Sequence, residues 1–137
     1  MKRQILFVLM CLMFSSIYAQ KEIAADELTY QLLPKMSKPI VIDFWADWCV
    51  PCKRYAPIYN KVASNMKAKA DFFRVNIDNN PDLSTAFDIS SIPTTIVIYD
   101  KSCHYLVRSG LISQEELKAA IDEACRRMQR NQDEDFF

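Results

Sequence analysis

Two cysteines separated by two residues are the feature of this sequence best suited to chemistry. Cys49 and Cys52 lie in the segment Trp48-Cys49-Val50-Pro51-Cys52-Lys53, which follows an apolar run and is expected to open a helix. The unpaired N–H groups at a helix N-terminus stabilise a thiolate on Cys49. Cys52 lies about one turn further along, within reach of a disulfide with Cys49. The pair therefore predicts thiol–disulfide exchange.

Three other uses of a Cys-x-x-Cys pair fit the sequence less well. A zinc knuckle needs a second close pair of ligands, whereas Cys103 and Cys125 are far apart in the sequence. Covalent haem attachment needs a histidine directly after the second cysteine, and this chain has Lys53 there. An inert structural disulfide is the remaining alternative, although this spacing at a helix start is unusual for one.

The composition excludes several other classes of function. The 137-residue chain has one glycine, Gly110, and one histidine, His104. Phosphate-binding loops need several glycines and multi-histidine metal centres need several histidines, so we expect no cofactor and no metal. The 17 basic residues balance 17 acidic ones, which argues against nucleic acid as a partner. We expect His104 to be an ordinary surface residue.

A small set of helices and strands must position the cysteine pair. Apolar runs predict strands at residues 40–45, 72–77, 94–99 and 105–108. Helical spacing of apolar residues predicts helices at 26–33, 49–65 and 82–87. A last helix is expected after Ser113, which forms a capping box with Glu116. The short connection between the last two strands suits an antiparallel hairpin, and the order of elements predicts a mixed sheet covered by helices on both faces.

The first 19 residues are interpreted as a signal peptide. Lys2 and Arg3 precede an apolar run at residues 5–14, and cleavage is predicted after Ala19. The run is short for a membrane-spanning helix, so an uncleaved N-terminal anchor is the alternative. Residues 20–137 then form one domain, which we expect to be exported, to the periplasm.

A longer pattern around the cysteines resembles a known family. Residues 41–53 look like the active-site strand and helix of the thioredoxin family, and Pro57 matches its helix-kinking proline. The tripeptide Ile92-Pro93-Thr94 resembles the family's loop in which a cis-proline faces the cysteines. The resemblance covers residues 21–130. It implies an α/β fold, a thioredoxin-like three-layer sandwich whose central mixed β-sheet is flanked by helices, and a redox disulfide between Cys49 and Cys52.

Asp43 interrupts an otherwise apolar strand. A charged carboxylate is costly there unless it is paired or its pKa is raised. The resemblance implies a buried aspartate that exchanges a proton with Cys52, while a strand-end residue that reaches water is the alternative. Family members usually carry a lysine near this carboxyl group. The matching position here is Arg74, whose side chain stays charged.

Residues around the cysteines are expected to contact substrate. These are Trp48, Val50, Pro51, Ile92, Pro93 and Gly110. The resemblance implies a cis bond between Ile92 and Pro93, which leaves the Ile92 backbone free to pair with an extended substrate. Gly110 is expected to mark a close backbone approach beside the redox site, with a simple turn as the alternative. Trp45 and Trp48 are expected to pack around the site first and to contact substrate second.

Cys103 and Cys125 stand apart from the redox pair. The lengths of the strand and helix that lead away from Cys103 and back to Cys125 bring the two residues to a similar height, far from Cys49. A structural disulfide between Cys103 and Cys125 is one hypothesis. Two unpaired thiols are the other.

Together these expectations describe an exported thiol–disulfide oxidoreductase that acts as a monomer on disulfide-containing proteins. The Val50-Pro51 dipeptide lacks the histidine typical of strong oxidants, so we expect a protein-disulfide reductase of reducing or intermediate potential. Because the chain has no nicotinamide site, such a reductase needs a membrane thiol electron donor. The alternatives are a disulfide oxidase or isomerase of the same fold, and a redox-inert binding or chaperone module.

Overall fold

A mixed sheet of five strands is the centre of the structure, a computed structural model that describes residues 20–134. The strands are β1 (Lys21–Glu22), β2 (Ile40–Trp45), β3 (Asp71–Asn76), β4 (Thr94–Ile98) and β5 (Tyr105–Ser109). Their order across the sheet is β1-β3-β2-β4-β5. The first three are parallel to one another, whereas β4 is antiparallel to both β2 and β5. The predicted mixed sheet and the predicted hairpin are therefore confirmed.

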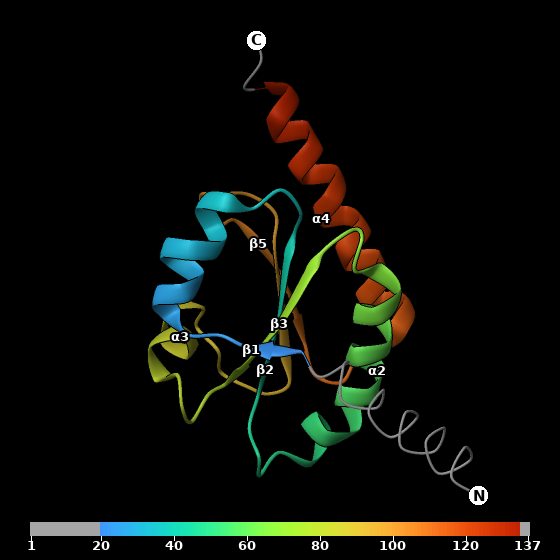
Figure 1. The fold of residues 1–137 in the computed structure, drawn as a ribbon. Coiled ribbons are helices and arrows are strands. Elements are labelled where there is room, and N and C mark those ends of the chain that lie inside the picture. Colours follow the sequence, from blue (N-terminus) through green and yellow to red (C-terminus); the bar gives the residue numbers. More distant parts are fainter. Residues whose placement is uncertain (1–19, 135–137) are drawn as a thin grey trace, which may run out of the picture.

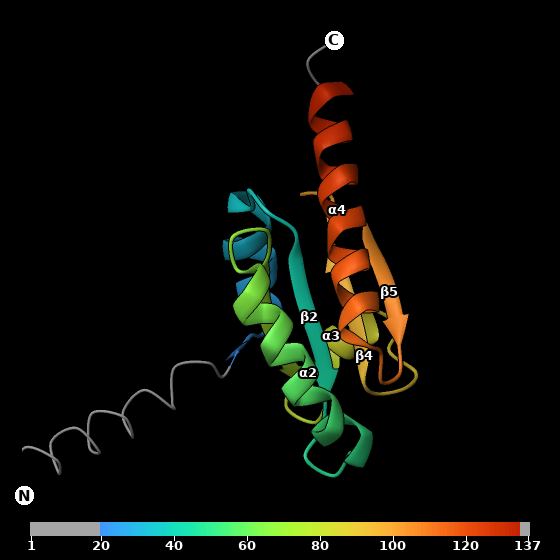
Figure 2. The ribbon, with the colours of Figure 1, turned by 90° about the vertical axis from the view of Figure 1, so that its right-hand side faces the viewer.

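Helices cover both faces of this sheet (Figure 1). One face carries the long helices α2 (Val50–Met66) and α4 (Gln114–Glu134). The other face carries the π-helix η2 (Glu27–Leu32), the 3-10 turn η3 (Leu33–Lys35) and α3 (Pro81–Ala86). Figure 2 shows α2 and α4 next to each other in front of the sheet. The expected three-layer sandwich is confirmed.

The central strand β2 is buried on both faces because it is apolar at every position except Asp43. Successive residues of a strand point to opposite faces. Val41 accordingly packs in the cluster under α2 and α4, whereas Ile40 and Ile42 pack in the cluster on the opposite face. Asp43 lies two residues after Val41, so the pleat directs its side chain to the face that α2 covers.

The start of α4 follows the predicted capping box. The backbone N–H of Ser113 donates to Glu116 Oε2 at 2.8 Å, and the N–H of Glu116 donates to Ser113 Oγ at 3.2 Å. These two bonds satisfy backbone N–H groups that have no partner inside the helix. The sequence pattern therefore identified the N-terminus of the last helix correctly.

Two features of the N-terminal part differ from expectation. The single helix predicted at 26–33 is a π-helical segment followed by a 3-10 turn that contains Pro34. Proline lacks an N–H group, so the hydrogen-bonding pattern changes at Pro34, directly after the predicted helix. The strand β1 was not predicted, because two residues are too short to show an alternating pattern.

The predicted signal peptide, residues 1–19, lies outside the described residues. Within residues 20–134, no helix combines the length and the apolar character needed to cross a membrane.

Candidate active site

Cys49 and Cys52 form a disulfide at the N-terminus of α2, with their Cα atoms 5.3 Å apart. Cys49 is the capping residue of this helix, and its Sγ accepts a hydrogen bond from the backbone N–H of Cys52 at 3.2 Å. Pro51 occupies the first turn, where its missing N–H removes no bond within the helix. In the reduced protein, the N–H of Cys52 and the positive end of the helix dipole are positioned to stabilise a thiolate on Cys49.

The loop before β4 faces the disulfide. The bond between Ile92 and Pro93 is cis, as the resemblance implied. The carbonyl oxygen of Ile92 lies 3.9 Å from Cys49 Sγ. Among the residues that the structure describes, no backbone hydrogen bond uses the N–H or the carbonyl of Ile92. An extended peptide can therefore pair with this backbone while its own sulfur lies near Cys49.

Gly110 lies beside this loop for a different reason from the one expected. Its N–H donates to the carbonyl oxygen of Pro93 at 2.8 Å, which links the end of β5 to the loop. Its φ angle is +83°, and a Cβ atom built at Gly110 would have no atom within 4 Å. The simple turn therefore explains the glycine, because the backbone conformation and not crowding by a neighbouring chain requires it.

Trp48 and Val50 form an exposed apolar rim next to the buried sulfur atoms. Their exposed fractions are 65% for Trp48 and 64% for Val50, against 4% for Cys49. Most of the Trp48 side chain is thus accessible to a bound polypeptide. Its indole N–H donates to Asp78 Oδ2 at 2.9 Å, which holds the ring at the surface. An aromatic ring fixed in this way offers apolar area to a bound polypeptide.

Asp43 is fully buried, which excludes the alternative that its carboxyl group reaches water. Arg74 donates from Nε to Asp43 Oδ2 at 3.1 Å, while Asp43 Oδ1 has no hydrogen-bond partner among the described residues. Burial raises the pKa of Asp43 to about 6, and the positive charge of Arg74 opposes that rise. The carboxyl group therefore changes its protonation state close to neutral pH, as a group that exchanges a proton with a thiol must.

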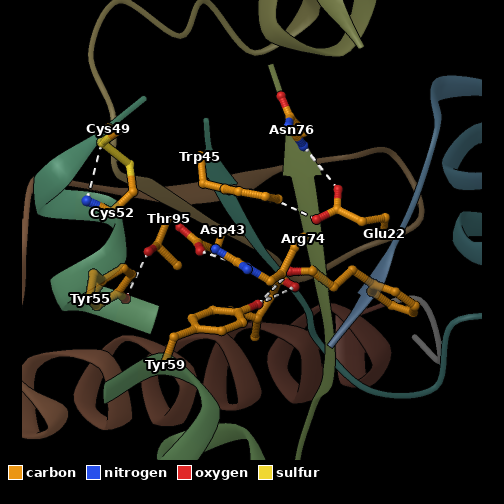
Figure 3. A network of polar contacts seen from close by, with 12 residues as sticks. Glu22, Asp43, Trp45, Cys49, Cys52, Tyr55, Tyr59, Arg74, Asn76 and Thr95 are labelled. Carbon is orange, nitrogen blue, oxygen red and sulfur yellow. Dashed lines mark hydrogen bonds and ion pairs between the residues drawn. A yellow bond between two sulfur atoms is a disulfide. The ribbon is translucent and has the colours of Figure 1, made fainter. Parts of the chain in front are cut away.

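Arg74 is held from its other side by Trp45, which was expected near the site, and through Trp45 by Glu22, which was not. Its guanidinium carbon lies 4.3 Å from the centre of the Trp45 ring (Figure 3). The indole N–H of Trp45 donates to Glu22 Oε1 at 2.6 Å, and Glu22 Oε2 accepts from the backbone N–H of Asn76 at 3.0 Å. No sequence signal identified Glu22, because the strand that carries it was not predicted.

Two buried tyrosines fix α2 on the sheet near Asp43. The hydroxyl groups of Tyr55 and Thr95 are 2.9 Å apart, and Tyr59 donates to the carbonyl oxygen of Phe73 at 2.7 Å (Figure 3). Burial raises the pKa of both tyrosines, so each hydroxyl keeps its proton. These contacts determine where the first turn of α2, and with it the disulfide, lies relative to β2.

Cys103 and Cys125 are free thiols, so the proposed structural disulfide between them is wrong. Cys103 packs against the core cluster on the face covered by η2 and α3, whereas Cys125 packs against the cluster under α2 and α4. The two thiols therefore belong to different packing clusters. Counting residues along a strand and a helix did not predict that the two thiols pack against different clusters.

His104 is exposed, and its Nδ1 lies 2.7 Å from Asp100 Oδ2 in the hairpin between β4 and β5. This agrees with the expectation of a surface residue. Over residues 20–134, no group of three or more histidine, cysteine, aspartate or glutamate side chains is arranged to hold a metal ion.

The fold and the site define a class of protein: a thiol–disulfide oxidoreductase with its redox disulfide at a helix N-terminus, opposite a cis-proline. The family follows from comparison with known sequences. The family model described as Thioredoxin matches residues 20–123. The chain therefore belongs to the thioredoxin family.

Named relatives agree with this assignment. The chain is 36% identical to the chloroplastic M-type thioredoxin of Brassica napus over 98 residues, which is 72% of this chain and 55% of that protein. The match thus spans about half the length of that relative. The chain is also similar to the thioredoxins of Acidithiobacillus ferridurans and Pseudomonas aeruginosa, at 35% and 33% identity. Each of these two matches covers 64% of this chain and 81% of the relative.

Proposed function

We propose that the chain is an exported protein-disulfide reductase that uses the Cys49/Cys52 dithiol. The observation that carries this proposal is the placement of Cys49 as the cap of α2, where the N–H of Cys52 donates to its sulfur at 3.2 Å. Such a position favours the thiolate, which is the form that attacks a disulfide.

The reaction proceeds in two exchange steps. The Cys49 thiolate attacks one sulfur of a substrate disulfide, so the substrate S–S bond breaks, a mixed disulfide forms, and one substrate thiolate leaves. Cys52 then loses its proton to the Asp43 carboxylate and attacks Cys49 Sγ. The second substrate thiolate leaves and the Cys49–Cys52 disulfide forms. The substrate gains two electrons, and the reductase loses two.

The surface around the sulfurs supports a protein substrate rather than a small molecule. The exposed rim of Trp48 and Val50 provides apolar contact area, and the Ile92 backbone provides hydrogen-bonding groups that are independent of side-chain identity. Backbone pairing suits an extended client segment of any sequence. Specificity for a particular client then depends on the rim.

Export and the electron donor belong to the same proposal. Its support is the sequence of residues 1–19, with two basic residues, an apolar run and a small residue at the predicted cleavage position. A reductase outside the cytosol must be reduced again after each turnover. We propose a membrane protein with a reactive dithiol as the donor, because thiol–disulfide exchange is the chemistry that the Cys49–Cys52 disulfide accepts.

The reduction potential of the Cys49–Cys52 couple tests the direction of the reaction. We expect a value below about −180 mV, between the isomerase value near −180 mV and the thioredoxin value near −270 mV. The physical reason is the Val50-Pro51 dipeptide, which places no histidine beside the Cys49 thiolate and therefore does not stabilise the reduced form as strongly as oxidants do. Equilibration with glutathione buffers, followed by alkylation and mass spectrometry, measures it.

A potential above about −180 mV would contradict a reductase and favour the oxidase or isomerase alternative. A disulfide that does not equilibrate with glutathione while the protein remains folded would favour the redox-inert binding module. Because Cys103 and Cys125 are free thiols, the Cys103→Ser/Cys125→Ser double variant is the matched control. It should give the same potential as the parent protein.

A further inference from the structure

Three residues of alternating charge lie in one row across the sheet. In the strand register, Glu22 on β1 is opposite Arg74 on β3, and Arg74 is opposite Asp43 on β2. Residues opposite each other on neighbouring strands point to the same face of a sheet. The row therefore runs from a carboxylate near the edge of the sheet, through a guanidinium group, to the buried carboxyl group beside α2 (Figure 3).

Glu22 accepts two hydrogen bonds, which join β1 to the strands β3 and β2. Its Oε2 accepts from the backbone N–H of Asn76 at 3.0 Å, which anchors the carboxylate to β3. Its Oε1 accepts from Trp45 Nε1 at 2.6 Å, which anchors it to the last residue of β2. A carboxylate that accepts from two donors in fixed positions holds the indole ring in one orientation.

The ring that Glu22 orients is the surface on which Arg74 lies. The Arg74 guanidinium carbon is 4.3 Å from the centre of the Trp45 ring, within the range of a cation–π contact. The same guanidinium group donates from Nε to Asp43 Oδ2 at 3.1 Å. A shift of the indole ring therefore removes one of the two contacts that keep Arg74 on Asp43.

We propose that Glu22 is a positioning residue for proton transfer at Asp43, because it fixes the Trp45 ring that holds the Arg74 guanidinium group against the Asp43 carboxylate. The inference rests on the proposed function, since proton exchange between Asp43 and Cys52 matters only during disulfide exchange. Glu22 touches neither substrate nor sulfur.

Glu22 affects the pKa of Asp43 in two opposite ways: its charge raises this pKa directly, and by positioning Arg74 it lowers it. The direction of the change in a Glu22 variant therefore separates the proposal from a simple charge effect. The negative charge of Glu22 raises the pKa of Asp43, whereas Arg74 lowers it through both its charge and its hydrogen bond. Both contributions of Arg74 are larger than that of Glu22. The other titratable groups near Asp43 belong to α2: the tyrosines Tyr55 and Tyr59, which burial keeps protonated, and Cys52, which does not titrate in the disulfide.

The test is the titration of Asp43 in the oxidised protein, followed by NMR of its carboxyl carbon. Glu22→Gln removes the charge and leaves one acceptor oxygen for two donors. We expect the pKa of Asp43 to rise by about 0.5 to 1, because a neighbouring arginine lowers a carboxyl pKa by about 1 to 3 and this variant weakens the contact with Arg74 without removing the arginine. Glu27→Gln is the matched control, since Glu27 pairs with Lys21 outside this network, and it should leave the pKa of Asp43 unchanged.

Repeating Glu22→Gln in the Trp45→Phe variant tests whether the effect of Glu22 on the pKa of Asp43 passes through the indole ring. In Trp45→Phe, no indole N–H remains for Glu22 to hold, so adding Glu22→Gln should not raise the pKa of Asp43 further. A fall or no change with Glu22→Gln in the parent protein would overturn the proposal, and so would an equal rise in both backgrounds. The titration uses no substrate, so its result is independent of whether the protein proves to be a reductase.

Discussion

Replacing Cys49 with serine is expected to abolish disulfide reductase activity. The serine hydroxyl is almost fully protonated at neutral pH, so the N–H of Cys52 and the dipole of α2 have no thiolate to stabilise. Without Cys49, no mixed disulfide forms at the helix cap. Loss of a nucleophile commonly lowers the rate by about a thousandfold or more, and we expect a loss of that order. Insulin reduction driven by excess dithiothreitol, corrected for the uncatalysed rate, measures it.

Cysteine variants outside the site control for general effects of removing a thiol. Cys125 is a free cysteine in α4 whose Sγ lies 3.7 Å from the carbonyl oxygen of Lys69. Cys125→Ser should therefore reduce insulin at the parental rate. Equal activity of Cys49→Ser and the parent protein would contradict the assignment of Cys49 as the attacking residue.

Replacing Asp43 with asparagine is expected to stabilise the protein at alkaline pH. The carboxyl group has an ordinary pKa of 3.8 and a pKa of about 6 in the folded protein, chiefly because it is buried. Between these pH values the folded state holds the proton more tightly than the unfolded state does. The contribution of Asp43 to the unfolding free energy is therefore most favourable below pH 3.8 and is lost as the pH rises through about 6.

The difference between the two pKa values corresponds to roughly 3 kcal/mol of unfolding free energy at pH 8. Asparagine has nearly the shape of the protonated carboxyl group and carries no charge to bury. We expect Asp43→Asn to raise the unfolding free energy at pH 8 by an amount of this order, and the gain to vanish at acidic pH. Urea denaturation of the oxidised protein across this pH range provides the measurement.

A surface aspartate supplies the comparison for this experiment. Asp122 on α4 pairs with Lys69 and remains exposed, so Asp122→Asn should change the stability little at any pH. If Asp43→Asn proved less stable than the parent protein at pH 8, the ion pair with Arg74 would outweigh the burial of the carboxylate. The raised pKa of Asp43 would then be wrong.

The parts of the fold that the sequence predicted are those with strong local signals. The apolar run of β2, the proline in the first turn of α2 and the Ser113–Glu116 capping box each determine their element through neighbouring residues. The redox pair was found because its spacing and its place between strand and helix are both local. The cis bond before Pro93 came from the resemblance, since nothing local distinguishes it from a trans bond.

The features that the sequence did not predict depend on contacts between distant segments. Glu22 joins the site only because β1 pairs with β3, and a two-residue strand leaves no pattern. The clusters against which Cys103 and Cys125 pack depend on how the hairpin and α4 lie on the sheet. The hydrogen bond from Trp48 to Asp78 joins residues 30 positions apart, so no local pattern predicted it.

The pH dependence of Cys49 alkylation by iodoacetamide in the reduced protein is the most direct test of how α2 activates its capping residue. The reaction rate of each cysteine, followed by mass spectrometry, reports its thiolate fraction. We expect Cys49 to titrate below the ordinary thiol value of about 8.5, because the helix N-terminus stabilises its thiolate. Cys103 and Cys125 should react more slowly at neutral pH, because burial raises the pKa of both thiols. A Cys49 that titrates like an ordinary thiol and reacts no faster than these two would contradict a thiolate stabilised by the helix N-terminus.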